Sequence, residues 1–276
     1  MRGNFLYQAE DPLSVQERQQ TQFKIFEHFD QTELLEAHHY QQDFPVHFHD
    51  RICITLVTEG YECTEVDGQR FMAPLGSISL THADEAHANP NLNEQAYSFL
   101  TFYVSPDVIR HISSLKRFRF KSRVVQDPTL FEMFYQMAKL PDVGEQAFIQ
   151  AIDYLAEEYI GPEQANQDFS IPQWNLPEVL AYIQEKMDDR IRLEQLALIA
   201  DCSSYQFIRW FKKAKGITPG QYITIKRVEA AKRLLKGGNT AVDAALSVGF
   251  YDQSHFTHAF RKLCGLTPSA YRKQMS

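Results

Sequence analysis

The sequence predicts a two-domain α+β protein, with a β-barrel and flanking helices first and an all-helical domain last. Three observations support this prediction. Short apolar runs separated by turn residues fill positions 44–104, and apolar residues at helical spacing follow over 127–160. The last third contains one short unit twice, at a constant offset of 49 positions. A chain of 276 residues is long enough for two domains of ordinary size.

The strand prediction depends on three apolar runs, at 52–57, 77–80 and 97–104. Many short strands with regular breaks indicate a sandwich or barrel of the jelly-roll or cupin kind. Residues 1–45 give no clear pattern. The turn signals between the runs are Gly60, Asp67-Gly68, Pro74-Leu75-Gly76 and Asn89-Pro90-Asn91.

Two apolar stripes predict helices after the strands, with the spacing of helices that pack on a barrel. The basic run 116–121 before them is predicted to be a solvated bend. The polar stretch 161–175, with two prolines, is predicted to be a linker. The first stripe is Leu130, Phe131, Phe134 and Met137, and the second is Phe148, Ile152, Leu155 and Tyr159.

The repeated unit has the pattern of a helix, a tight turn and a second helix. In the first copy, over 193–215, Ser203 is expected to cap the second helix and Gly216 to end it. In the second copy, over 240–264, Asp252 and Gly265 take these places. A long helix is predicted between the copies. Two helices at a steep angle, the second ending in basic residues, have a shape that fits a DNA major groove.

The second copy resembles the C-terminal signature of AraC/XylS-type bacterial transcription regulators. The matching stretch is 244–262, closed by Gly265-Leu266-Thr267-Pro268 and Tyr271-Arg272. The resemblance covers the last third of the chain. It implies a double helix-turn-helix DNA-binding domain behind a cupin-like effector domain. Residues 45–49, Gly60, residues 74–77 and His87 are similar to such an effector barrel, although this match is looser.

The second helix of each unit is expected to present its N-terminal residues to the bases, where burial does not require them. Arg209 is suited to a bidentate contact with guanine and Gln253 to one with adenine, each worth about 1–3 kcal/mol of discrimination. His258 stands where the family often has arginine. The predicted base-reading residues are Ser204, Tyr205, Ile208 and Arg209 in the first unit and Gln253, Ser254, His255 and His258 in the second.

Basic residues at the ends of the same helices are predicted to hold phosphates of double-stranded DNA. The total charge of −7 hides this, because residues 1–170 have 12 Lys+Arg against 26 Asp+Glu. Residues 171–276 have 16 against 9, a net charge of +7 that suits a phosphate-facing surface. The predicted phosphate contacts, including two capped helix starts, are Lys212, Lys213, Thr218, Arg261, Lys262 and Thr267.

Histidines in the strand region indicate a polar pocket. His47, His49 and Cys53 have the same strand parity, and the resemblance adds His87. In metal-binding cupins a glutamate follows the H-x-H pair, but Cys53 and Ile54 occupy its places here. We therefore predict that these residues line a small-molecule effector pocket or are structural histidines, with no cofactor. A metal sensor that uses His47, His49 and His87 is the alternative.

The predicted function is a sequence-specific DNA-binding transcription regulator that responds to a small-molecule effector. The resemblance implies an activator, since activation is commoner than repression in that family. RNA polymerase would then be a further partner. The resemblance implies that Phe148, Ile152, Leu155 and Tyr159 form a homodimer interface, and packing on the barrel is the equal alternative. The predicted domains are 1–160 and 176–276. A cupin enzyme with a DNA-binding tail is disfavoured by the absent glutamate, so the protein is not expected to be an enzyme.

The compartment is predicted to be the cytoplasm. The N-terminus has neither an apolar run nor a basic leader, so neither a signal peptide nor a membrane span is expected. The four cysteines are scattered, without a C-x-x-C pair, and are interpreted as reduced thiols.

Overall fold

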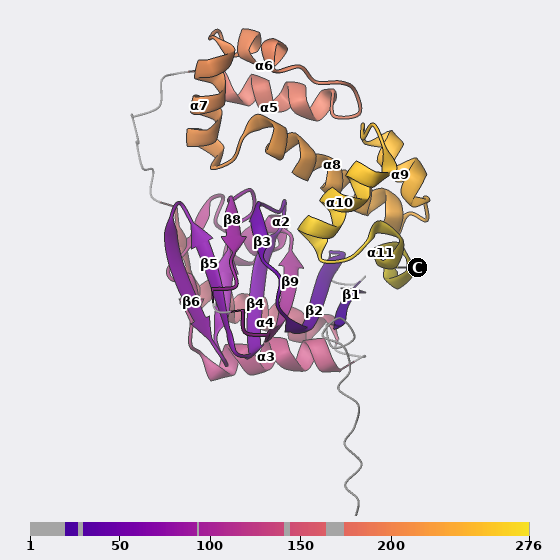
Figure 1. The fold of residues 1–276 in the computed structure, drawn as a ribbon. Helices are drawn as coiled ribbons and strands as arrows, with labels where there is room; N and C mark the ends of the chain where they lie inside the picture. The colour runs from indigo at the N-terminus through magenta and orange to yellow at the C-terminus, as the bar shows by residue number, and fades with distance from the viewer. Residues whose placement is uncertain (1–19, 27–29, 93, 141–143, 164–173, 276) are drawn as a thin grey trace, which may run out of the picture.

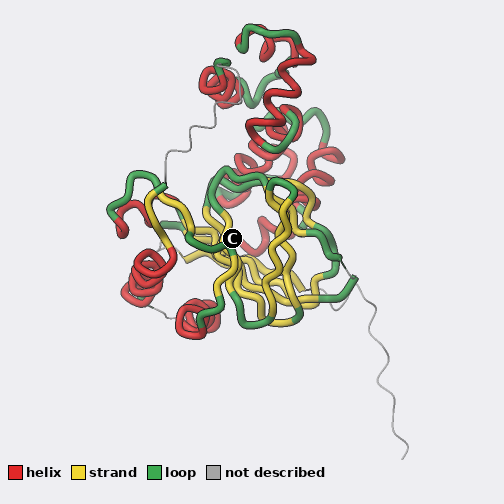
Figure 2. Tube along the Cα trace, turned by 90° about the vertical axis from the view of Figure 1, so that its left-hand side faces the viewer, coloured by secondary structure: helices red, strands yellow, loops and turns green. Residues whose placement is uncertain are grey.

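The computed structural model describes residues 20–26, 30–92, 94–140, 144–163 and 174–275. The strands of the N-terminal half form a barrel, and the helices of the C-terminal half lie across one end of it (Figure 1). A view turned by 90° shows two further helices end-on beside the strands (Figure 2). The predicted two-domain α+β architecture is confirmed. Within the described ranges, no helix combines the length and apolar character that crossing a lipid bilayer requires.

Two antiparallel sheets form the barrel. The larger has the strand order β1-β2-β9-β4-β7-β11 and the smaller β3-β8-β5-β6, and a β10-β12 ribbon lies beside them. The runs predicted at 52–57, 77–80 and 97–104 become β4, β7 and β9. The strands are β1 (Gln20–Phe26), β2 (Thr32–Tyr40), β3 (Phe44–His47), β4 (Ile52–Glu59), β5 (Tyr61–Val66), β6 (Gln69–Pro74), β7 (Ile78–Thr81), β8 (His87–Asn89), β9 (Tyr97–Val104), β10 (Phe118–Phe120), β11 (Val124–Val125) and β12 (Ile160–Pro162).

Strand β4 shows how the sequence builds the barrel wall. Successive side chains point to opposite faces, so Ile54 and Leu56 enter the core beneath the covering helices while Cys53 and Thr55 face the interior. The covering helices are α2 (Pro106–Ser113), α3 (Pro128–Lys139) and α4 (Glu145–Tyr159). Both faces of β4 are therefore buried, which explains why its sequence is apolar almost throughout.

The second apolar stripe lies inside the chain's own core. Phe148, Ile152 and Leu155 on α4 are buried in the cluster that joins this helix to the larger sheet. Tyr159 donates a hydrogen bond from its hydroxyl to Asp127, which caps α3, at 2.8 Å. A helix that covers a sheet uses its apolar stripe on that sheet. The predicted dimer interface at these residues is therefore wrong, and the alternative of packing on the barrel is correct.

The basic run 116–121 is more ordered than a solvated bend. Its residues Phe118–Phe120 form β10, which pairs with β12 over Ile160–Pro162. Gly161 and Pro162, at the start of the predicted linker, thus belong to a strand beside the barrel. Residues 164–173 of that linker lie outside the described residues, as does the stretch before β1.

The helix caps predicted at Ser203, Thr218 and Asp252 are present in the structure. Ser203 and Thr218 each form a capping box, and Asp252 accepts a hydrogen bond from the His255 backbone N–H. Gly216 and Gly265 end their helices in the left-handed conformation that glycine tolerates. The helices are α5 (Leu176–Glu185), α6 (Leu193–Ile199), α7 (Ser204–Lys215), α8 (Pro219–Lys236), α9 (Ala241–Ser247), α10 (Gln253–Cys264) and α11 (Pro268–Met275).

The two helix-turn-helix units have different cores. The first, α6 and α7, packs around Phe207 and Phe211 with α5, and Phe48 is the barrel residue of that buried cluster. The second, α9 and α10, has no separate core. Phe256 and Phe260 belong to one buried cluster that continues into the barrel. The barrel contributes Phe23, Leu35, Ala37, Tyr40, Phe44, Cys53, Tyr97, Phe99 and Tyr103 to this joint core.

Candidate functional site

Helix α7 presents the predicted base-reading residues of the first unit. Burial of Phe207 and Phe211 fixes the helix, and this leaves Tyr205 and Arg209 exposed while Ser204 and Ile208 are half-buried. The Arg209 guanidinium lies over the Tyr205 ring at 5.9 Å from its centre. The four side chains are spaced to lie near one another at the N-terminal end of α7, with an apolar, an aromatic and a basic group among them.

Helix α10 has a corresponding surface depression. It is lined by Gln253, Ser254, Thr257, His258, Arg261 and Thr267. His255 does not join it, and its ring lies instead against Phe250 at 5.3 Å. Thr257 is absent from the predicted set. A signal for it exists, because the 49-residue offset that defines the repeat carries Ile208 onto Thr257.

The predicted phosphate contacts lie at the helix ends. Lys212, Lys213, Arg261 and Lys262 are exposed in the last turns of α7 and α10. Thr218 and Thr267 are half-buried N-caps, whose hydroxyls accept hydrogen bonds from the backbone N–H groups of Gln221 and Ala270. The two units thus offer cations and capped helix starts in matching places.

The barrel interior contains a small polar cavity. Its volume is about 30 Å³, which is room for one or two water molecules. Residues from both sheets and one residue of α10, Leu263, line it. The lining residues are Leu35, Phe44, His47, His49, Cys53, Thr55, Glu62, Thr81, His87, Asn89, Phe99, Thr101, Tyr103 and Leu263. All four residues predicted for the pocket therefore meet at this cavity.

Burial sets the protonation of the cavity groups. Burial, and then the neighbouring imidazoles, hold the pKa of His47 well below its usual value, and burial with His49 lowers the pKa of His87 to about 4. Both rings are thus neutral near pH 7. Burial raises the pKa of Glu62 to about 7, and one Glu62 oxygen accepts a hydrogen bond from Asn89 at 3.0 Å. The sequence interpretation missed Glu62, which reaches the cavity from β5.

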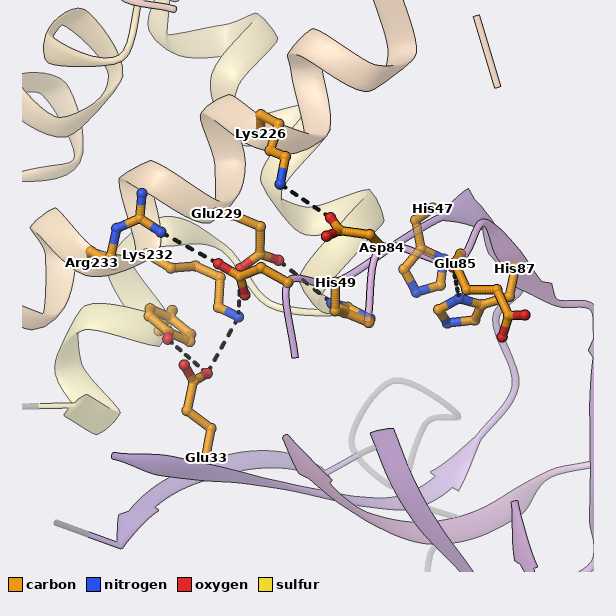
Figure 3. Close-up of polar contacts among 12 residues, drawn as sticks. Glu33, His47, His49, Asp84, Glu85, His87, Lys226, Glu229, Lys232 and Arg233 are labelled. Carbon is orange, nitrogen blue, oxygen red and sulfur yellow. Dashed lines mark hydrogen bonds and ion pairs between the residues drawn. The ribbon is translucent and has the colours of Figure 1, made fainter. Parts of the chain in front are cut away.

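A buried ion-pair network joins the cavity to helix α8 (Figure 3). Glu229 of α8 lies 3.5 Å from Nδ1 of His49 and 3.3 Å from Nζ of Lys232. The Lys232 Nζ is in turn 3.3 Å from Glu33 of β2, which also binds Lys236 and accepts a hydrogen bond from the Tyr271 hydroxyl. This network was not predictable from the sequence, because Glu33 of the barrel and Lys236 of α8 are 203 positions apart in the chain.

The charges in this network stabilise one another. Burial alone would raise the pKa of Glu33, but Lys232 and Lys236 outweigh it and lower that pKa. Burial would likewise lower the pKa of Lys232, yet Glu229 and Glu33 raise it well above its usual value. A buried ion pair that loses one partner leaves an uncompensated charge, which costs about 3–5 kcal/mol. The docked position of α8 thus depends on matched barrel and helix charges.

A barrel with a polar cavity, joined to two helix-turn-helix units on one connecting helix, defines a ligand-binding transcription regulator. Family models agree with both halves. The model of an AraC-like ligand binding domain matches residues 31–152, and that of a helix-turn-helix domain matches residues 196–274. The chain belongs to the AraC family of DNA-binding transcription regulators.

Individual relatives support this membership. An uncharacterized HTH-type transcriptional regulator, YobQ of Bacillus subtilis (strain 168), is 30% identical over 221 residues, which cover 75% of this chain and 86% of YobQ. The HTH-type transcriptional activator RhaS of Escherichia coli O6:H1 is 24% identical, with 84% and 89% covered. The crystal structure of ToxT from Vibrio cholerae has the same fold, with a TM-score of 0.58 at 11% identity, covering 88% of this chain and 98% of ToxT.

Proposed function

We propose that this regulator reads DNA with α7 and α10 and that the occupant of the barrel cavity controls this reading through α8. The proposed base contacts are the predicted residues of α7 together with Gln253, Ser254, Thr257 and His258 of α10. The proposed phosphate contacts are Lys212, Lys213, Arg261, Lys262 and the helix starts at Thr218 and Thr267. The exposed polar and basic side chains on equivalent faces of two repeated helices support this assignment.

Helix α8 relates the two units to each other. It is a continuous helix of 18 residues whose buried side chains pack on both sides. Two helix-turn-helix units that enter successive major grooves on one face of DNA lie about 34 Å apart. We infer an operator with two half-sites about one helical turn apart. Regulators of transcription act where the chromosome is, so we also propose a cytoplasmic location.

The single observation that supports ligand control is the contact between His49 and Glu229. His49 lines the barrel cavity, and Glu229 belongs to the helix that holds both units. A ligand that moves or fixes the His49 ring therefore changes the surroundings of α8 directly. We propose that an occupied cavity strengthens this docking and favours DNA binding.

We further propose activation as the regulatory sign, with RNA polymerase as a partner, since the similar RhaS is an activator. A homodimer remains part of the proposal. Its surface must lie outside the buried stripe of α4, and the exposed outer side of that helix, which includes Ile149, is a candidate.

Lys232→Met tests the coupling, with its neighbour Arg233→Met as the control. Lys232 is buried between two carboxylates, whereas Arg233 is exposed and pairs with Asp50 at 3.6 Å. We expect Lys232→Met to lower the free energy of unfolding by about 3–5 kcal/mol, and Arg233→Met by less than about 1 kcal/mol. Cognate DNA affinity, measured by fluorescence anisotropy on a site selected from random duplexes, should fall about tenfold for Lys232→Met only.

Each outcome has a definite meaning. If the full chain selects no sequence from random duplexes, the assignment of α7 and α10 as base-reading helices is wrong. If both variants bind the selected site as tightly as the wild type while Lys232→Met is destabilised, docking of α8 does not control DNA binding.

A further inference from the structure

Three buried histidines of the barrel gather at one point. His47 lies on β3, His49 follows it, and His87 begins β8 of the same sheet. One nitrogen from each ring lies within 4.8 Å of the others. In a tetrahedral zinc site with bonds of about 2.0–2.1 Å, such nitrogens are about 3.4 Å apart. The rings are therefore close to ligand spacing and need to approach by about an ångström.

The hydrogen bonds of His47 and His87 leave one nitrogen of each ring available to a metal. Nδ1 of His47 donates to the Pro45 carbonyl at 2.7 Å, and Nδ1 of His87 donates to the Glu85 carbonyl at 2.9 Å. A carbonyl oxygen only accepts, so Nδ1 has the hydrogen and Nε2 keeps its lone pair in the neutral ring. Metal-binding histidines typically have this arrangement, in which a backbone carbonyl fixes the tautomer.

The third ring, that of His49, faces its hydrogen-bond acceptor in the C-terminal domain. Nδ1 of His49 faces the Glu229 carboxylate of α8 at 3.5 Å (Figure 3). This nitrogen is buried and has no hydrogen bond of normal geometry. A carboxylate behind the ring of a metal-bound histidine raises the basicity of that ring and sets its orientation. A shorter bond from His49 to Glu229 would complete the same pattern for all three rings.

The size of the cavity favours an ion over an organic molecule. Pockets for organic ligands have volumes of about 300–1,000 Å³, whereas the cavity here measures about 30 Å³. An ion with one water molecule fits this space without opening the barrel. Neutral imidazoles suit zinc, copper, nickel and iron, and suit magnesium or calcium poorly.

We propose that His47, His49 and His87 bind one divalent transition-metal ion of the zinc class, and that Glu229 is a positioning residue for His49. This inference rests on the proposed function and names the chemical class of its effector. Metal binding fixes the His49 ring, which strengthens its bond to Glu229 and hence the docking of α8. The ion in the barrel is thereby linked to both DNA-reading helices.

Zinc titration of the full-length protein tests the site. The protein, first stripped with a chelator, competes with a chromophoric chelator for added zinc sulfate. We expect one ion per chain, and we expect His47→Ala and His87→Ala each to weaken binding at least about 100-fold. Circular dichroism checks that both variants fold. Cys202→Ser is the control for thiol binding, because Cys202 is partly exposed and the other three cysteines are buried. Less than one ion per chain, or equal affinity in the histidine variants, would overturn the site.

Glu229→Gln tests the positioning role, with Asp84→Asn as the matched control. Asp84 also makes an ion pair to α8, at 3.3 Å from Lys226. It donates a hydrogen bond to the His49 carbonyl from its backbone N–H, at 2.7 Å, and Asp84→Asn retains that bond. We expect Glu229→Gln to weaken zinc about 10–100-fold and to shift the visible spectrum of the cobalt-loaded protein, with neither change in Asp84→Asn. An unchanged spectrum and affinity would remove Glu229 from the site.

DNA binding in the same preparations separates the two proposals. Zinc should raise the affinity of the wild type for the selected DNA site about tenfold, and it should not change the DNA affinity of His87→Ala. If zinc does not bind but DNA is still read, the metal site is wrong and the DNA-reading assignment stands. If zinc binds without a change in DNA affinity, the site stands and its control of α8 is wrong.

Discussion

The two helix-turn-helix units are copies in sequence but differ in their attachment to the barrel. The first unit packs around its own aromatic residues with α5, and Phe48 and the partly buried Ala86 join that core from the barrel. The second unit shares the joint core with nine barrel residues. Their turns differ as well, since residues 200–203 separate α6 from α7 while residues 248–252 separate α9 from α10. A duplicated element can thus become one anchored unit and one self-contained unit.

The largest expected difference between the two units concerns a pair of tyrosines at the same repeat position, Tyr222 and Tyr271. Tyr271 packs on Phe23 of β1 at 5.1 Å and donates its hydroxyl to Glu33, whereas Tyr222 packs on Phe48 at 5.0 Å. Tyr271→Ala should lower the free energy of unfolding by about 3–5 kcal/mol and expose the β1 amides to hydrogen exchange. Tyr222→Ala should leave those amides protected. Equal loss of β1 protection in both variants would mean that the second unit is not the anchored one.

A smaller difference between the units is expected in how strongly each contributes to sequence-specific DNA binding. Arg209 can make a bidentate contact, and His258 at the equivalent position cannot. Arg209→Ala should weaken binding to the selected site by about 1–3 kcal/mol, and His258→Ala by less. Binding to random duplexes, measured by anisotropy at the same salt concentration, should change little for either. If Arg209→Ala weakens both kinds of duplex equally, this residue does not read sequence.

The smallest expected difference between the two units concerns their phosphate contacts, because both units are expected to contribute equally to the salt dependence of DNA binding. Lys212→Ala and Arg261→Ala should each reduce the slope of log affinity against log salt by about one unit. Arg70→Ala, on the barrel surface, should leave the slope unchanged and is the control. A slope that changes for Lys212 alone would indicate that the second unit holds no phosphate through Arg261.

Local signals explain how far the sequence predicts this molecule. Caps at Ser203, Thr218 and Asp252 and the glycine at 216 act within one helix turn, and the structure has each where it was predicted. The assignment of the α4 stripe failed because apolar spacing indicates burial without naming the partner surface. The contact between His49 and Glu229 was not predictable, since the segment after β3 and helix α8 are far apart in the chain and meet only after both domains fold.

The joint core has an evolutionary consequence for how such regulators exchange parts. A new ligand-binding barrel can replace this one only if its residues in the joint core match Phe256 and Phe260 of the second unit and Tyr271 of α11. Fewer barrel side chains constrain the sequence of the first unit. Its reading helix is therefore free to acquire a new operator preference without retuning the sensor, while changes in the second unit must remain compatible with the barrel.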